Sequence, residues 1–370
     1  MNKTEILNLN IGPQHPSTHG VLRLYVSLDG EYIKDVKPVI GYLHRGMEKL
    51  AESRTYAQYL PMVDRVDYLS GFFYSALMCY AVERAARIEV PEYAEYLRLI
   101  TMELNRIASH VLWLGTFLLD LGATSPLFYC FREREDILKL LENLTGQRMM
   151  YNYYFFGGVR YDVPDGWFDD VKRLCEKLPF MFDEYEKIIT SNPIFLDRTK
   201  GIGVLRKETA VEYAISGANL RASGVKFDVR KDMPYGVYDE INFDVPADVD
   251  GDCYARYMIR LKEMRESVRI ILQGLKNIKD TEAGKIYFTK VNPLTLKVPE
   301  GDLHVCVEAP RGAAMIYLKS EGGGKPTRIK WRTPSFNAVQ VMPEVMRGVL
   351  YADLIAILGS FDIVLPEVDR

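Results

Sequence analysis

The sequence has few of the residues that build metal centres or disulfide frameworks. Its five cysteines, Cys79, Cys130, Cys175, Cys253 and Cys306, are odd in number and far apart, and no CxxC pair occurs. Disulfide scaffolds, zinc sites and iron–sulfur sites need closely spaced thiols. We therefore interpret all five as small packing residues. Histidine is also scarce, with five residues, three of them within the first 44 positions.

Long uncharged stretches are absent as well. The two longest segments without Asp, Glu, Lys or Arg are Ile6 to Leu22, 17 residues, and Tyr68 to Val82, 15 residues, whereas a membrane-spanning helix takes about 20 mostly apolar residues. The opening MNKTEILNLN has no apolar core behind its lysine and does not look like a secretory signal. We expect a soluble, cytoplasmic protein that can still dock on a membrane protein.

No charge of one sign dominates. The 370 residues include 47 Lys+Arg and 50 Asp+Glu, a net charge of −3, which argues against a nucleic-acid-binding protein. Apolar residues make up 48%, enough to form a core and to exclude intrinsic disorder. The length allows two domains or one large one.

Periodicity predicts a small sheet followed by a helical core. Residues 22–28 alternate apolar and polar side chains, and Asp29-Gly30 is a hairpin turn signal, so a second strand is expected over 31–40. Apolar residues spaced by three and four predict a long helix from Pro91 to Leu121-Gly122. Further helices are expected at 56–87, 133–146, 167–190 and 254–275, and strands at 302–308, 314–320 and 327–332.

No repeat or low-complexity linker divides the chain. We predict an α+β fold in a single domain, 1–370. Within it we expect an N-terminal β-hairpin region at 1–40, a helical core at 47–190 and an α+β remainder at 191–370.

Two histidine clusters could carry chemistry. His15 and His19 are spaced as in a helical zinc site, but Pro16 and the flanking glycines disfavour a helix. We interpret the segment as a tight loop that presents two imidazoles, with a polar turn of no chemical role as the alternative. The pair His44-Arg45 beside Gly46 could place positive charge near an anionic group, or it could be a solvated helix start.

Carboxylates stand at two unusual places. Asp64, Arg65 and Asp67-Tyr68 interrupt an apolar segment that we predict to be helical, which indicates a buried ion pair or a polar cavity. Asp120 ends the long helix, where the helix dipole disfavours a negative charge. We expect it to have a partner, a histidine being a natural one, with an exposed last-turn aspartate as the alternative.

Two glycine-rich segments lack the patterns that bind nucleotides. Gly322–Lys325 lacks the spacing of a phosphate loop, because Pro326 follows the lysine. Residues 201–206 lack the dinucleotide fingerprint. We therefore expect a turn between strands at 322–325, and no NAD or ATP site.

Several long motifs resemble one family, the D subunits of NADH-quinone oxidoreductase, which are the large hydrogenase-like subunits of respiratory complex I. The similarity runs from about Leu7 to the terminal VDR and covers nearly the whole chain. The motifs are GPQHPSTHGVLRL at 12–24, GYLHRGMEKLAESRTY at 41–56, DRVDYLSG at 64–71, FREREDI at 131–137, SNPIFLDRTKGIGV at 191–204, LRASGVKFDVRK at 220–231 and EMRESVRII at 263–271.

The resemblance implies a fold like that of the nickel–iron hydrogenase large subunit. That ancestor holds its metal with two CxxC pairs, and the corresponding places here read DRVD at 64–67 and DIVL at 362–365. Residues 308–312, EAPRG, keep a hydrogenase-like sequence. Without thiolates the nickel site cannot form, so this chain is expected to hold no metal, and the emptied cavity becomes a quinone pocket.

The resemblance also implies roles for four residues. His19 and Tyr68 correspond to the pair that hydrogen-bonds the two carbonyls of the quinone head group. Asp120 corresponds to the carboxylate that contacts this histidine. Arg45 corresponds to an arginine beside a [4Fe–4S] cluster held by a neighbouring subunit. The chain alone is thus expected to bind no cofactor, with quinone as the substrate.

The implied setting is a proton-translocating complex on the cytoplasmic side of the cell membrane. Expected partners are the iron–sulfur protein of the complex (its B subunit), the C and other peripheral-arm subunits, and the H subunit of the membrane arm, with NADH or a related donor upstream. Three alternatives remain open: a non-catalytic scaffold, a hydrogenase-type large subunit, and a metal hydrolase built on His15 and His19.

One segment departs from the family pattern. Many relatives carry a histidine near the cluster within 146–159, where Met150 stands here, and a nearby arginine is replaced by Phe155. The resemblance therefore implies a lower cluster potential that depends less on proton binding, which suits a low-potential quinone such as menaquinone.

Overall fold

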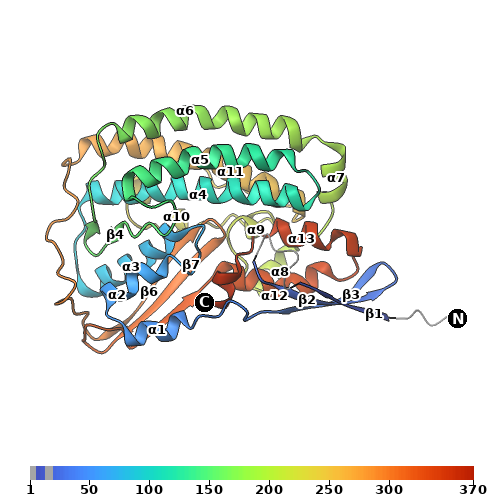
Figure 1. The fold of residues 1–370 in the computed structure, drawn as a ribbon, viewed down its shortest axis with the longest axis horizontal. Coiled ribbons are helices and arrows are strands. Elements are labelled where there is room, and N and C mark those ends of the chain that lie inside the picture. Colours follow the sequence, from blue (N-terminus) through green and yellow to red (C-terminus); the bar gives the residue numbers. More distant parts are fainter. Residues whose placement is uncertain (1–5, 13–19) are drawn as a thin grey trace.

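The fold has two parts: a layer of long helices over one sheet, and a second sheet that extends from one end (Figure 1). The computed structural model describes residues 6–12 and 20–370, so the predictions for His15 and His19 lie outside the described residues. The α+β class is confirmed. The long helices are α4 Glu92–Asp120, α5 Ser125–Thr145, α6 Trp167–Tyr185 and α11 Cys253–Asn277.

Helix α4 is the centre of the helical layer. It follows Pro91 and ends at Asp120, as the apolar stripe predicts, and most of its side chains are buried. Helices α5 and α11 pack along it. At Gly274 of α11 the helices are so close that an added Cβ would lie 2.9 Å from Leu99 Cδ2, so a small residue is required there.

The helix predicted over 56–87 is wrong in one respect. The chain forms α2, Tyr56–Val63, and α3, Gly71–Ala86, with a turn at 64–70 between them. In this turn the Asp67 carboxylate accepts hydrogen bonds from the Leu69 amide, at 3.0 Å, and from the Ser70 hydroxyl. Aspartate side chains that bond nearby backbone compete with helix formation. Tyr68 therefore lies in a turn and not inside a helix.

The N-terminal sheet contains the predicted hairpin and one further strand. Strands β1 Ile6–Ile11, β2 Arg23–Asp29 and β3 Tyr32–Val39 pair antiparallel in that order. Gly30 turns the hairpin with φ of +63°. Strand β1 is mostly exposed, although Leu9 and Ile11, which alternate with Asn8 and Asn10, pack against the core. The buried face of β2 belongs to the same apolar core as α12, Pro334–Met346.

The C-terminal sheet places one arginine at the middle of the molecule. Strands β6 Gly301–Ala309, β7 Gly312–Ser320 and β8 Arg328–Arg332 are antiparallel, and Pro310-Arg311 forms the turn between β6 and β7. Gly217 lies against this turn, because a Cβ there would be 2.4 Å from Gly312 Cα. The predicted strands are confirmed, and residues 322–325 lie between β7 and β8, as expected.

Shorter elements connect these parts. All five cysteines are free, and Cys306 is half-buried while the other four are buried. Among the described residues, no helix is both long and apolar enough to cross a bilayer. The remaining elements are α1 Met47–Ser53, β4 Tyr154–Phe155, β5 Gly158–Val159, a π-helical turn Glu186–Thr190, α7 Pro193–Thr199, α8 Lys207–Glu212, α9 Gly217–Arg221, α10 Val229–Asp232, α13 Leu354–Ser360, α14 Leu365–Asp369 and 3-10 turns at Tyr238–Glu240, Ile278–Asp280 and Tyr351–Asp353.

Candidate functional site

The candidate site is centred on the buried guanidinium of Arg311. Its Nη1 donates to Asp67 Oδ2 at 2.6 Å, and its Nη2 donates to Ser109 Oγ at 3.3 Å and to Asp362 Oδ1 at 3.4 Å. Both carboxylates are buried. One cation thus joins the 64–70 turn, helix α4 and the C-terminal segment, and the predicted buried ion pair at Asp67 is confirmed.

The negative charges of the two carboxylates keep the buried Arg311 guanidinium protonated. Burial alone lowers the pKa of Arg311, but the charges of Asp362 and Asp67 outweigh it and hold the pKa above its ordinary value. Asp362 has a left-handed backbone, with φ of +55°, a conformation that costs a residue other than glycine energy and is often found at functional sites. Its second oxygen lies 3.9 Å from Arg260 Nε.

The two aspartates of the DRVD motif have different surroundings. Asp64 is also buried, but it accepts hydrogen bonds from the Ser75 hydroxyl and, at 3.1 Å, from the Asn152 amide. Burial raises its pKa to about 6, although these hydrogen bonds oppose the rise. Asp64 therefore fastens the turn to the segment near Met150, whereas Asp67 faces Arg311.

Tyr68 is half-buried next to these charges. Burial raises the pKa of its phenol, Asp67 raises it further, and Arg311 and Arg134 oppose the rise. The phenol therefore keeps its proton at neutral pH, while two cations lie close enough to favour its anion. This combination suits a group that donates a hydrogen bond and can give up a proton when it is pulled strongly.

Arg134 of α5 is a site residue that sequence reasoning missed. It is half-buried, and among the described residues it has no carboxylate within 4.0 Å. Burial lowers the pKa of its guanidinium. The FREREDI motif contains it among four other charged side chains, of which Glu133 is buried as well. Only the packing of α5 against the 64–70 turn distinguishes it.

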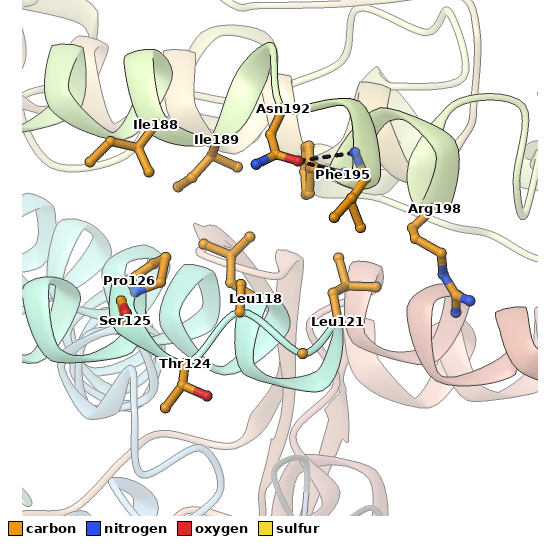
Figure 2. A pocket seen from close by; sticks show the side chains of 13 residues that line it. Leu118, Leu121, Thr124, Ser125, Pro126, Ile188, Ile189, Asn192, Phe195 and Arg198 are labelled. Carbon is orange, nitrogen blue, oxygen red and sulfur yellow. Dashed lines mark hydrogen bonds between the residues drawn. The ribbon is translucent and has the colours of Figure 1, made fainter.

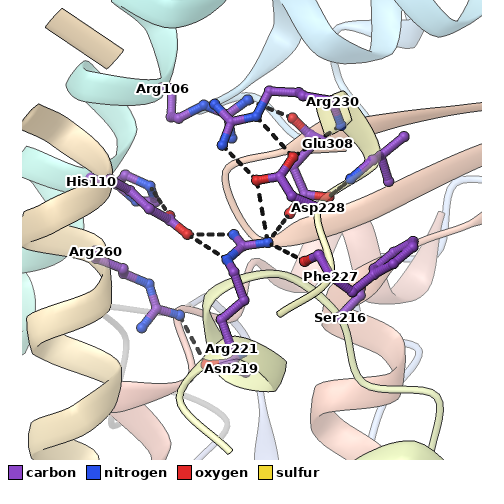
Figure 3. Close-up of polar contacts among 12 residues, drawn as sticks. Arg106, His110, Ser216, Asn219, Arg221, Phe227, Asp228, Arg230, Arg260 and Glu308 are labelled. Carbon is purple, nitrogen blue, oxygen red and sulfur yellow. Dashed lines mark hydrogen bonds and ion pairs between the residues drawn. The ribbon is translucent and has the colours of Figure 1, made fainter. Parts of the chain in front are cut away.

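A network of buried ions joins helices α4, α9 and α11 to strand β6 (Figure 3), and β6 leads into the turn that carries Arg311. Arg221 of α9 donates to Glu263 Oε1 and, at 2.7 Å, to Glu308 Oε1. The imidazole Nε2 of His110 lies 3.1 Å from Glu263, and burial lowers the pKa of His110 despite that carboxylate. Buried charges that are mutually paired hold their elements in one arrangement. The network thus fixes α4, α9, α11 and β6 around the site.

Arg45 lies at the outer side of the 64–70 turn. Its exposed guanidinium donates to the Arg65 carbonyl at 2.7 Å, and burial together with Arg65 lowers its pKa, against the charge of Asp369. Asp369 in turn accepts from the Gly41 and Leu43 amides at 2.8 and 2.7 Å. Gly46 caps helix α1, so the His-Arg-Gly cluster is a helix start whose arginine stays accessible.

The contacts described above do not join the other two predicted residues, His19 and Asp120, to the cluster around Arg311. His19 lies outside the described residues. Asp120 is the half-buried last residue of α4 and has an interaction partner. Since a helix rises about 1.5 Å per residue, Asp120 lies roughly 16 Å along α4 from Ser109, which contacts Arg311.

A large apolar cavity lies elsewhere and is not the candidate site. It has a volume of about 500 Å³ and separates the junction of α4 and α5 from α7 (Figure 2). Arg198 is its one charged lining residue, and that side chain pairs with Asp353 at 3.6 Å. Apolar walls without convergent polar groups offer little to acid–base chemistry. Within the part of the chain that is described, no cluster of His, Cys, Asp or Glu side chains could hold a metal ion.

Comparisons with known proteins agree on one family. The family described as "Respiratory-chain NADH dehydrogenase, 49 Kd subunit" matches residues 120–370. The chain is similar to proteins named as the D subunit of NADH-quinone oxidoreductase from Geobacillus kaustophilus, at 50% identity over 371 residues, and from Bacillus mycoides, at 49% identity over 369 residues. Both alignments cover 100% of this chain and of the relative.

Replacing Arg311 by methionine should destabilise the protein strongly. The variant keeps the aliphatic stem but leaves Asp67 and Asp362 buried without their cation, which costs about 3–5 kcal/mol of unfolding free energy. Urea unfolding of the chain measures the loss.

The exposed Arg173, which pairs with Asp170 on the surface, supplies the control. Arg173→Met should change stability little. A loss below about 1 kcal/mol in Arg311→Met would mean that the bridge does not hold the three segments together.

Proposed function

Because the chain belongs to the family of the 49 Kd subunit of respiratory-chain NADH dehydrogenase, we propose that it forms a quinone-reduction site together with an iron–sulfur subunit of an NADH-quinone oxidoreductase. Family membership favours this over a scaffold, a hydrogenase-type subunit or a metal hydrolase. The observation that carries the proposal is Tyr68, a half-buried phenol beside Asp67 on which the charges of Arg311 and Arg134 act.

The chemistry requires such a phenol. Reduction of a quinone adds two electrons and two protons, and negative charge develops on both carbonyl oxygens. A protonated tyrosine donates a hydrogen bond to one oxygen and can transfer its proton as that oxygen becomes basic. Arg311 and Arg134 stabilise the negative charge that is left on the phenol, because charges act strongly where water is largely excluded.

The opposite carbonyl is assigned by family resemblance to His19. An imidazole donates at neutral pH and titrates near it, and a carboxylate on its other nitrogen fixes its orientation and favours its charged form. Asp120 is proposed for that role. Its position at the end of α4, where the dipole disfavours a lone carboxylate, supports a cationic partner. Loss of the histidine proton would then leave Asp120 without its ionic partner and start the response of the membrane part.

The electrons are proposed to arrive on the Arg45 side. Arg45 is exposed and contacts the first residues of the same turn that carries Tyr68, so a [4Fe–4S] cluster docked there would be close to the phenol. The B, C and H subunits of the complex are the proposed partners, and the cytoplasmic face of the membrane is the proposed location. The chain would act as a peripheral subunit that lends residues to the pocket.

Tyr68→Phe should lower quinone reduction by the assembled complex about 100-fold, because general acid catalysis contributes on the order of 10²–10⁴. The measurement is the quinone-reductase rate in membranes, normalised to electron input to an artificial acceptor that bypasses the quinone. Tyr32→Phe, at a strand position that is 57% exposed, is the matched control. Full quinone reduction by Tyr68→Phe would reject the role of this phenol.

Asp120→Asn should slow quinone reduction in the same assay while leaving the artificial acceptor reaction intact. The amide keeps the shape of the side chain but cannot favour an imidazolium. An unchanged rate would remove Asp120 from the proposed relay and leave the role of Tyr68 standing.

Met150→His should make the potential of the neighbouring cluster depend more strongly on pH. In this chain Arg160 lies over the Phe155 ring at 4.6 Å, and the Asp64 carboxyl, whose pKa is about 6, accepts from the Asn152 amide. We therefore expect the potential between about pH 6 and 8 to fall more steeply with pH in the variant than in the parent, because the variant adds an imidazole that titrates there.

Redox titration followed by EPR measures this potential, with Met150→Gln as the control for a change of polarity alone. Position 150 has a φ of +58°, a conformation that histidine tolerates better than most residues. A parent potential that falls with pH as steeply as the variant's would contradict the expectation.

A further inference from the structure

A second acidic group lies beneath the proposed quinone site. Glu367 of α14 is fully buried. Its Oε1 accepts from the Tyr74 hydroxyl at 2.6 Å, and its Oε2 accepts from the Ser335 hydroxyl. Among the described residues, no Lys, Arg or His nitrogen lies within 4.0 Å of it. Two neutral donors thus hold a buried carboxyl that has no cation in contact.

The charges around Glu367 do not offset the cost of burying its carboxylate. Asp67 faces Glu367 from the 64–70 turn, while Arg311 from the β6–β7 turn and Arg332 from β8 act on it at longer range. The Arg311 charge is already shared by Asp67 and Asp362. Burial first, and then Asp67, raise the pKa of Glu367 to about 7, against Arg311 and the two hydroxyls.

We propose that Glu367 is a charge-compensating residue of the quinone site, which takes up a proton from solvent when Tyr68 gives its proton to the reduced quinone. The inference rests on the proposed function. In this step the O–H bond of Tyr68 breaks, an O–H bond forms on the quinone, and an O–H bond forms on Glu367. The buried cluster therefore keeps its net charge, and Glu367 releases its proton when Tyr68 is protonated again.

Glu367 does not touch the quinone. It acts through the Asp67–Arg311 pair, whose charges act on both Glu367 and Tyr68. Its helix also reaches the electron-entry side, since Pro366 O accepts from Arg45 at 3.5 Å and Asp369 holds the backbone before Arg45. Helix α14 therefore contacts Arg45 on the proposed electron-entry side and also carries Glu367, the proposed site of proton uptake.

The sign of the pH dependence follows from the charge that is required. Glu367 can accept a proton only as a carboxylate, so the rate should rise as the pH rises through about 7. For one group with that pKa, the ionised fraction increases about tenfold between about pH 6 and 8. Glu367→Gln fixes the neutral form, so its quinone-reductase rate should stay near the parent's acid value and lose this rise.

Two further variants keep the carboxyl and test the same group. Tyr74→Phe and Ser335→Ala each remove a hydrogen bond that favours the carboxylate, so the rise should move to higher pH. Infrared difference spectra of the assembled complex, taken on quinone reduction, should contain a protonated carboxylic acid band that Glu367→Gln lacks. These two variants decide the question if Glu367→Gln fails to assemble.

The outcomes separate this inference from the proposed function. A rise with pH that Glu367→Gln, Tyr74→Phe and Ser335→Ala all leave unchanged overturns the role of Glu367. If Tyr68→Phe still lowers quinone reduction about 100-fold in that case, the proposed function stands without it. If Tyr68→Phe also keeps its full rate, the proposed function fails, and the inference fails with it.

Discussion

The arrangement of the site depends on one buried cation that holds two carboxylates. Arg311 stands in the tight turn between β6 and β7 and contacts Asp67, Ser109 and Asp362. A guanidinium can do this because its planar fork donates in several fixed directions and stays charged when buried. The contacts bring together the 64–70 turn and the C-terminal segment, the two places that, by the family resemblance, correspond to the metal-holding pairs of the hydrogenase large subunit. In this chain an ion bridge joins them.

The bridge also explains why neighbouring acids behave differently. Asp67 contacts the cation directly, whereas Glu367 contacts two hydroxyls and is left with the repulsion of Asp67. The negative charge of Asp67 raises the pKa of Tyr68, and the positive charges of Arg311 and Arg134 oppose that rise. Environments that push the pKa values of nearby groups apart are how one site separates proton donors from proton acceptors. In the proposed site Tyr68 is thus the proton donor and Glu367 the buried acid that takes up a proton.

Regular elements could be predicted from the sequence, and the site only in part. The stripe on α4 and the alternation on β2 are local patterns, so the helix and the hairpin follow from them. The break at 64–70 could not be predicted, because Asp67 leaves the helix for a partner 244 residues away. Arg134 and Glu367 were missed for the same reason, since burial next to distant segments gives them their properties. Tyr68 and Arg45 were predicted by resemblance, and the fold places Tyr68 on the 64–70 turn and Arg45 in contact with that turn.

The most direct test is a structure of the assembled complex with quinone bound, at a resolution that defines side chains. The account predicts that a carbonyl oxygen of the head group lies within hydrogen-bond distance of the Tyr68 hydroxyl, with Arg311 still bridging Asp67 and Asp362. A head group bound in the apolar cavity between α4 and α7, or a Tyr68 side chain turned away from it, would contradict the account.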